Sequence, residues 1–309
     1  MSDSTDTINK SDNSMIAKMT QDIAQRFSFD ELDARGCYAQ LSKSIKDIQA
    51  THHYPPELAK LLNQFAVSAV LLRDTVKLDG SLSIQYRTSG AIAMLIADCG
   101  SDYGVRAICE FDVERFPNQL EAIDLREFGN DATLTITMTP NNGKRYQGVV
   151  PIESATLAEC LQDYFLRSEQ LPTRFVLHAD KDFAVGVSLH AMPEQDSEIV
   201  AIVKDDWQRL NLLLDTVHEQ ELAELDASTL LTRLFHEEHC RLHEEKQVRF
   251  SCDCSRQRSI VAILSLGKDE ITDLISEQEV VVIDCHFCFQ RYEFSCQELA
   301  DMLIEMSEE

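Results

Sequence analysis

The chain has little positive charge and no long apolar run. Its 309 residues contain 28 Lys and Arg against 53 Asp and Glu, which gives a formal net charge of −25 at pH 7. Non-specific binding to nucleic acid or anionic lipid depends on clustered Lys and Arg, so this balance argues against both partners. No apolar run is long enough to span a membrane, and the polar first residues lack the features of a secretory signal. We therefore expect a cytoplasmic protein without nucleic-acid or membrane partners.

Familiar catalytic motifs are also missing. The sequence contains no glycine-rich phosphate loop, no nucleophile elbow and no Ser/His/Asp set that stands out. The segment His236-Glu237-Glu238-His239-Cys240 with His243 resembles a metal motif, but His239 and His243 do not enclose the glutamate of a zincin. A solvated helix face explains this segment better. The sequence therefore does not predict an enzyme.

Composition and periodicity predict an α+β protein with four regions. A polar, disordered leader occupies residues 1–20, and a mixed strand and helix domain follows at 21–193. The composition changes at Pro193-Glu194-Gln195-Asp196-Ser197, and residues 198 to about 245 have the apolar period of consecutive helices. We expect a marginally stable helical linker at 194–249 and a cysteine-containing module at 250–309, since short helices need a partner surface.

Within the main domain, alternating apolar residues predict several strands and two helices. A long helix is expected to open at Pro55-Pro56-Glu57, and a second one at Thr156–Phe165. The turn Pro140-Asn141-Asn142-Gly143 predicts a hairpin. The expected strands are Ser81–Tyr86, Ile92–Ala97, Val105–Phe111, Thr133–Met138, Tyr146–Ile152, Arg174–Leu177 and Phe183–Leu189. In the last module, helices are expected between the cysteine pairs and after Ser295.

Four cysteines in two close pairs are the most informative feature that is present. Cys252-x-Cys254 is followed, after thirty intervening residues, by Cys285-x-x-Cys288. Two such pairs supply four sulfur ligands to a tetrahedral metal, and we expect one zinc ion per chain. Without the metal, each pair can also close as a disulfide, so the site suits either a static zinc knuckle or a redox switch. A third alternative, a thiol-disulfide oxidoreductase, rests only on the spacing of Cys285 and Cys288.

The other cysteines and the nearby arginines have ordinary explanations. Arg249, Arg256, Arg258 and Arg291 could offset the charge of four thiolates, or could be surface residues. The remaining cysteines lack metal-ligand spacing, and buried free cysteine is a common small hydrophobe. We therefore expect structural roles for Cys37, Cys99, Cys109, Cys160, Cys240 and Cys296.

The cysteine module resembles the heat shock protein 33 family of redox-regulated chaperones, also called 33 kDa chaperonins. The matching segments there are Phe250–Arg258, Leu264–Glu270 and Cys285–Cys288, with Tyr292 and Phe294 after them. One departure is Phe289-Gln290, where the family more often carries a small turn-permitting residue. Further family-like segments follow the family order upstream: Arg35-Gly36, His53-Tyr54-Pro55, Lys77–Gly80, Tyr146–Pro151, Ser168–Thr173 and Leu234–Glu238.

The resemblance implies an ATP-independent holdase that is latent when reduced and zinc-bound. It implies that oxidation pairs Cys252 with Cys254 and Cys285 with Cys288, releases zinc and unfolds the module. The linker would then leave the main domain and expose an apolar surface for unfolding client proteins. The family also implies dimerisation on activation and later transfer of clients to ATP-dependent foldases. The alternative left open is a structural zinc-binding interaction module without redox cycling.

Overall fold

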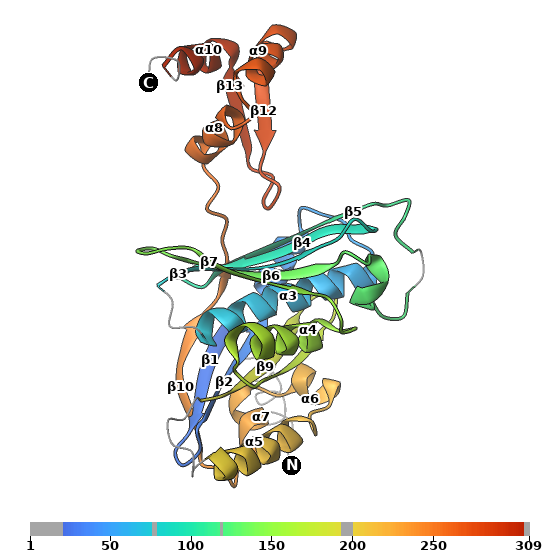
Figure 1. Cartoon of the computed structure of the whole chain (residues 1–309), viewed down its shortest axis with the longest axis vertical. Coiled ribbons are helices and arrows are strands. Elements are labelled where there is room, and N and C mark those ends of the chain that lie inside the picture. Colours follow the sequence, from blue (N-terminus) through green and yellow to red (C-terminus); the bar gives the residue numbers. More distant parts are fainter. Residues whose placement is uncertain (1–20, 76–78, 118–119, 193–199, 306–309) are drawn as a thin grey trace, which may run out of the picture. The chain divides into compact units, whose positions relative to one another are not determined.

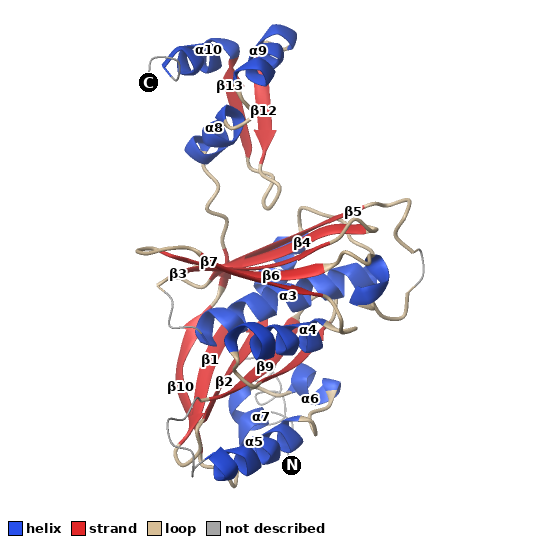
Figure 2. Cartoon of the chain, viewed as in Figure 1, coloured by secondary structure: helices blue, strands red, loops and turns tan. Residues whose placement is uncertain are grey.

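The computed structural model describes residues 21–75, 79–117, 120–192 and 200–305. The expected leader at 1–20 and the composition change at 193–197 lie outside these residues. The chain divides into two compact units, residues 1–251 and 252–309. Strands and helices are mixed in both (Figures 1 and 2), which confirms the predicted α+β class. None of the described helices is both long and apolar enough to cross a bilayer.

Two sheets form the frame of the first unit. The antiparallel five-stranded sheet has the order β10-β1-β2-β9-β8, and the six-stranded sheet has the order β11-β5-β4-β3-β6-β7 with β11 parallel to β5. The strands of the first sheet are β1 (Ile23–Phe29), β2 (Ala34–Leu41), β8 (Thr173–Ala179), β9 (Ala184–Ala191) and β10 (Cys240–Gln247). Those of the second are β3 (Gly80–Arg87), β4 (Ile92–Cys99), β5 (Gly104–Phe111), β6 (Thr133–Pro140), β7 (Tyr146–Pro151) and β11 (Arg249–Phe250).

The long helix α3 (Pro56–Thr75) lies between the two sheets (Figure 1) and contacts strands of both. It is apolar around most of its circumference, as a helix covered on both sides must be. Leu58, Leu62 and Phe65 are fully buried in the main core. The shorter helix α4 (Leu157–Tyr164) begins with a capping box between Thr156 and Glu159. The remaining short helices are α2 (Lys43–Gln49), η1 (Leu125–Phe128) and η2 (Phe165–Glu169).

Three linker helices cover the other face of the five-stranded sheet: α5 (Val200–Leu214), α6 (Glu219–Glu224) and α7 (Ala227–Phe235). They bury a second hydrophobic cluster against β1, β2 and β9. The ring of Phe235 lies 6.0 Å from that of Phe27 and 5.2 Å from that of Phe29, measured between centroids. The linker side chains buried in this cluster are Leu210, Leu214, Leu222, Ala227, Leu230, Leu231, Leu234 and Phe235. The apolar stripes of the linker therefore face the sheet.

The linker differs from its expected helical structure at its end. The helices stop at Phe235, and residues 240–247 form β10, which pairs antiparallel with β1. Edge pairing decides this outcome, because β1 offers a free backbone ladder that a helix could not satisfy. All seven strands predicted in the main domain are present, including the hairpin of β6 and β7. The sequence did not predict β1, β2 or α2.

The second unit is small. Helices α8 (Arg256–Leu264), α9 (Lys268–Glu277) and α10 (Cys296–Glu305) accompany the antiparallel pair β12 (Val280–Asp284) and β13 (Arg291–Ser295). The three helices agree with those expected between the cysteine pairs and after Ser295. Its core consists of Ile260, Ile263, Ile271, Val281, Phe294 and Leu299. So few buried side chains stabilise a fold weakly, and modules of this size commonly depend on a metal or on disulfides.

Candidate metal centre

The four paired cysteines meet in the second unit. Cys252 and Cys254 precede α8, which starts where the hydroxyl of Ser255 accepts a hydrogen bond from the amide of Arg258. Cys285 and Cys288 lie in the turn between β12 and β13, just beyond the last paired residues of these strands. The four Sγ atoms lie within 4.8 Å of one another. The fold thus brings together residues that are more than thirty positions apart in the sequence.

The spacing of the sulfur atoms fits a tetrahedral metal. Metal–thiolate bonds of about 2.3 Å in a tetrahedron place the sulfurs about 3.8 Å from one another. The observed contacts are 3.6 Å between Cys252 and Cys285 and 3.4 Å between Cys254 and Cys288. Small side-chain rotations would complete the tetrahedron. The four cysteines could therefore hold one metal ion.

The thiols differ in how readily they ionise. Partial burial opposes ionisation of Cys285, but amide N–H groups of Cys288 and Phe287 donate to its sulfur, and its pKa is lowered on balance. Partial burial is the main reason that the pKa values of Cys252 and Cys288 are raised. Metal binding requires thiolates, so the surroundings of Cys285 favour its metal-binding form, whereas those of Cys252 and Cys288 oppose it.

Tyr292 contacts the sulfur cluster directly. Its hydroxyl donates a hydrogen bond to Cys254 Sγ over 3.2 Å, and this bond raises the pKa of Tyr292 to about 12. A donor that stays protonated stabilises the thiolate form of its acceptor. In the sequence, Tyr292 belongs to the family-like residues after the second cysteine pair, but nothing there indicates its contact with Cys254.

The turn that carries the second pair has an unusual backbone. Phe289, half-exposed, has φ of 53°, in the left-handed region that favours glycine. Its amide nevertheless donates to the carbonyl of Cys285 over 2.8 Å, which closes the turn. The departure from the family pattern at Phe289-Gln290 therefore leaves the turn intact and places a bulky residue where a small one is easier to accommodate.

The neighbouring arginines bind carboxylates. Arg256 pairs with Glu298 and lies over the ring of Phe294, 4.3 Å from its centroid. Arg258 pairs with Asp253, Arg291 with Asp284, and Arg249, in the first unit, with Asp102. Of the two interpretations of these arginines, the structure favours ordinary ion pairs.

The remaining cysteines lie apart from the cluster. Cys37, Cys99, Cys109 and Cys160 are buried in the main core. Burial raises the pKa of all four, and that of Cys99 and Cys160 to about 12, which makes these thiols unreactive. Cys240 is half-buried in β10, and Cys296 Sγ donates to the carbonyl of Gln278 over 2.6 Å. These positions agree with structural roles.

The histidine-containing segment makes no metal site. His236 is exposed at the end of α7, whereas His243 lies in β10 and bonds the hydroxyl of Ser28. Within the described part of the chain, the four paired cysteines form the one candidate metal cluster. The prediction of a helix face was wrong for this segment, because α7 ends at Phe235, residues 236–239 form a turn and β10 begins at Cys240.

Comparisons with known proteins point to one family. The family model described as "Hsp33 protein" matches residues 22–295. The 33 kDa chaperonin of Azotobacter vinelandii is 42% identical over 283 residues and that of Pseudomonas paraeruginosa is 41% identical over 282; each alignment covers 91% of this chain and 94% of the relative. The crystal structure of the 33 kDa chaperonin of Thermotoga maritima has the same fold, with a TM-score of 0.77 at 20% identity, over 93% of this chain and 99% of that one. The chain therefore belongs to the Hsp33 family of chaperones.

Proposed function

We propose that the protein is a redox-regulated holdase whose four paired cysteines bind zinc in the latent state and act as the oxidant sensor. The convergence of the four sulfur atoms within 4.8 Å carries this proposal. Four thiolates at tetrahedral spacing are a donor set that zinc prefers, and zinc has no redox chemistry of its own. Oxidation therefore acts on the ligands.

Each oxidation step removes two electrons from a pair of cysteines. One thiolate attacks hydrogen peroxide to form a sulfenic acid, and the neighbouring thiolate displaces hydroxide to form the disulfide, so that two thiols and one peroxide give one disulfide and two waters. The proposed pairs are Cys252 with Cys254 and Cys285 with Cys288. The short contacts join Cys252 to Cys285 and Cys254 to Cys288, but Cys252 also interacts with Cys254, so rotation of side chains makes either pairing accessible. Disulfides no longer ligate zinc, and the small core of the second unit then lacks its main support.

Loss of the second unit would loosen the linker through the segment that precedes Cys252. This segment is weakly attached to the first unit. β11 pairs with β5 over only two residues. Most side chains of β10 are exposed, so β10 is attached mainly by its backbone hydrogen bonds to β1. Helices α5 to α7, which precede β10 in the chain, cover apolar side chains of β1, β2 and β9. Their release would expose an apolar face suited to unfolding proteins. The charge of −25 would keep the open form in solution.

The partners of this activity are unfolding client proteins. We further propose that the active form is a homodimer that later transfers clients to ATP-dependent foldases. A thiolate metal site of this kind suits a reducing compartment, and we place the protein in the cytoplasm.

Peroxide treatment at mildly elevated temperature is expected to release about one zinc ion per chain and to start suppression of client aggregation. Reduction with zinc present should reverse both. A chromogenic chelator measures the zinc, and light scattering of a thermally unfolded client measures protection. If zinc stays bound and the four thiols remain unoxidised after the oxidant pulse, the chain is a structural zinc-binding module. If the protein suppresses client aggregation equally before and after oxidation, the redox switch is contradicted but the holdase activity is not.

The substitution Tyr292→Phe is expected to lower zinc affinity by about tenfold, because outer hydrogen bonds to metal ligands typically contribute this much. Without its donor, Cys254 is also a stronger nucleophile, so peroxide should release zinc several-fold faster. Competition with a chelator gives the affinity, and mass spectrometry of alkylated peptides gives the reaction rate of Cys254. Tyr146→Phe, which removes a hydroxyl bonded to Glu169 in the first unit, is the matched control. Unchanged zinc release in the Tyr292 variant would show that the hydroxyl has no role at the site.

A further inference from the structure

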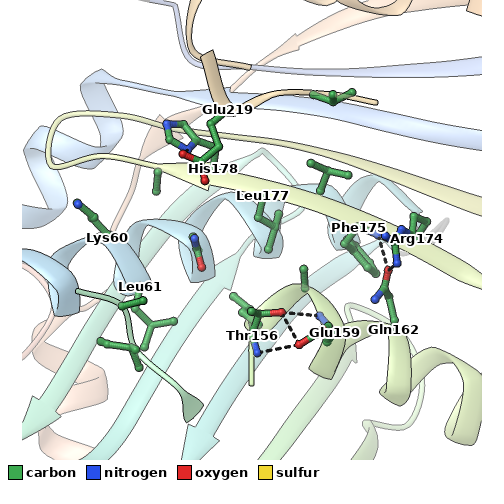
Figure 3. Close-up of a pocket in the computed structure, with 18 of the residues that line it drawn as sticks. Lys60, Leu61, Thr156, Glu159, Gln162, Arg174, Phe175, Leu177, His178 and Glu219 are labelled. Carbon is green, nitrogen blue, oxygen red and sulfur yellow. Dashed lines mark hydrogen bonds and ion pairs between the residues drawn. The ribbon is translucent and has the colours of Figure 1, made fainter. Parts of the chain in front are cut away.

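The five-stranded sheet ends in an open edge that lies along a large cleft. Among the residues that the structure describes, β8 is the last strand of this sheet and pairs only with β9. A cleft of about 680 Å³ runs beside it, and six consecutive residues of the strand, 174–179, line this cleft. Figure 3 shows Arg174, Phe175, Leu177 and His178 along the strand, with Lys60 and Leu61 of α3 and Gln162 of α4 nearby. An unpaired edge beside a cleft is a template for one more strand.

The backbone of β8 points hydrogen-bonding groups into this cleft. The amide of Phe175 faces away from β9 and donates to Oε1 of Gln162 over 3.3 Å. In an antiparallel pair, alternate residues direct both backbone groups away from the partner strand. Leu177, two residues further along, therefore directs its N–H and C=O outward as well. An added strand would bond the outward backbone groups of Phe175 and Leu177. The amide of Phe175 is occupied by Gln162, so the backbone groups of Leu177 are the next that such a strand can use.

Apolar side chains contribute to both walls of the cleft, between the charged residues that also line it. Phe175 packs into the main core on the side of α3 and α4, whereas Val176 packs against the cluster under the linker helices. Leu61 and Leu157 line the first wall, and Leu214 and Val217 line the second. Side chains of a strand alternate between faces. An added strand would thus direct alternate side chains to the two walls.

The charge of the cleft determines which polypeptide segments it favours. Glu57, Glu121, Glu159, Asp215 and Glu219 line it, against the permanent cations Lys60 and Arg174. Lys60 is paired with Glu57 and Arg174 with Asp215, at 3.0 and 2.6 Å. The net charge of the lining residues is negative. Lys or Arg in the bound segment is therefore favoured, and Asp or Glu is disfavoured.

We propose that this cleft binds an extended segment of an unfolded polypeptide as an added strand on β8, with preference for segments that combine apolar and basic residues. Binding by strand addition takes its affinity from main-chain hydrogen bonds and its selectivity from the alternate side chains. The cleft exists with α5 and α6 in place, so a short segment can enter it while the apolar face under the linker helices stays covered, and its binding gives no client protection. Because Leu214, Asp215 and Val217 form one wall, the occupant also stabilises the linker in its packed position.

The test uses the full-length reduced protein and a fluorescent peptide of seven residues, the length of β8, that alternates valine with lysine. Leu177→Pro removes the outward donor and leaves the bonds between β8 and β9, since proline is tolerated where an edge N–H faces outward. Leu177→Ala loses the same packing but keeps the donor. We expect the proline variant to bind the peptide about tenfold more weakly than the alanine variant. Gln162→Ala, which frees the amide of Phe175, should bind several-fold more tightly than the unchanged protein.

Three outcomes would overturn this inference. The first is that the proline and alanine variants bind the peptide equally well. The second is that a peptide with glutamate in place of lysine binds as well as the lysine peptide. The third is that the chain self-associates through the Leu177 donor and thereby excludes the peptide. The last outcome would assign the edge to a second copy of the chain. Client protection by the oxidised protein is measured separately, so that a failure of peptide binding leaves the proposed holdase function standing, and the reverse also holds.

Discussion

Replacement of Cys288 by serine is expected to abolish zinc binding and to unfold residues 252–305, while the two sheets and α3 of the first unit remain folded. Zinc binding to a structural thiolate site contributes about 10–16 kcal/mol, which exceeds the stability of most whole domains. The core of the second unit, built on residues such as Ile263, Ile271 and Phe294, is too small to compensate. Amide hydrogen exchange with mass spectrometry locates the loss, and elemental analysis counts the zinc.

Cys296→Ser is the matched control for this experiment. Cys296 lies in the same unit but bonds the carbonyl of Gln278 and takes no part in the sulfur cluster. This variant should retain about one zinc ion per chain and the exchange protection of the unchanged protein. If Cys288→Ser binds zinc as before and protects the same amides, the four cysteines do not support the fold of this unit.

Truncation of Phe235 to alanine is expected to give client protection in the reduced protein, without oxidant. Phe235 is buried at the end of α7, where its ring packs against Phe27 and Phe29 of β1. Removal of a buried phenylalanine side chain typically costs about 3–5 kcal/mol. Short helices depend on such packing, so a loss of this size should release α5 to α7 from the sheet in a large fraction of molecules. Light scattering of an unfolding client and binding of a hydrophobic dye report the exposed face.

The control for this variant is Leu212→Ala on α5. Leu212 is 68% exposed, so its truncation removes little buried contact. This variant should remain latent until it is oxidised. If amide exchange in α7 accelerates in Phe235→Ala while the reduced protein still fails to protect a client, the linker helices do not cover the client-binding face.

Sequence patterns predicted the elements whose signals are local. The hairpin of β6 and β7 follows from turn residues, α3 follows from a proline start and an apolar period, and α4 begins at the capping pair Thr156 and Glu159. β1 and β2 escaped prediction because their residues are buried on both faces and show no clean alternation. β10 was taken for helix because its polar sequence acquires strand structure only by pairing with β1.

The candidate site likewise combines residues that the sequence identifies with contacts that only the structure shows. The four cysteines and their expected metal chemistry could be read from spacing, because cysteine pairs separated by one or two residues can serve one metal in many different folds. Tyr292 could not be assigned, because its bond to Cys254 joins β13 to the segment before α8. The open edge of β8 was also inaccessible, since a strand carries no signal that tells a central position from an edge until its neighbours are known.

The sequence by itself determined the family, the acidic character and the identity of the four clustered cysteines, because these depend on residue type and order along the chain. The tertiary structure decided which atoms meet: the four sulfurs with the Tyr292 hydroxyl, the linker leucines with the face of β1, β2 and β9, and the unpaired edge of β8 with its acidic cleft. Contacts between distant segments depend on packing and edge pairing across the whole unit, and local periodicity carries no information about them.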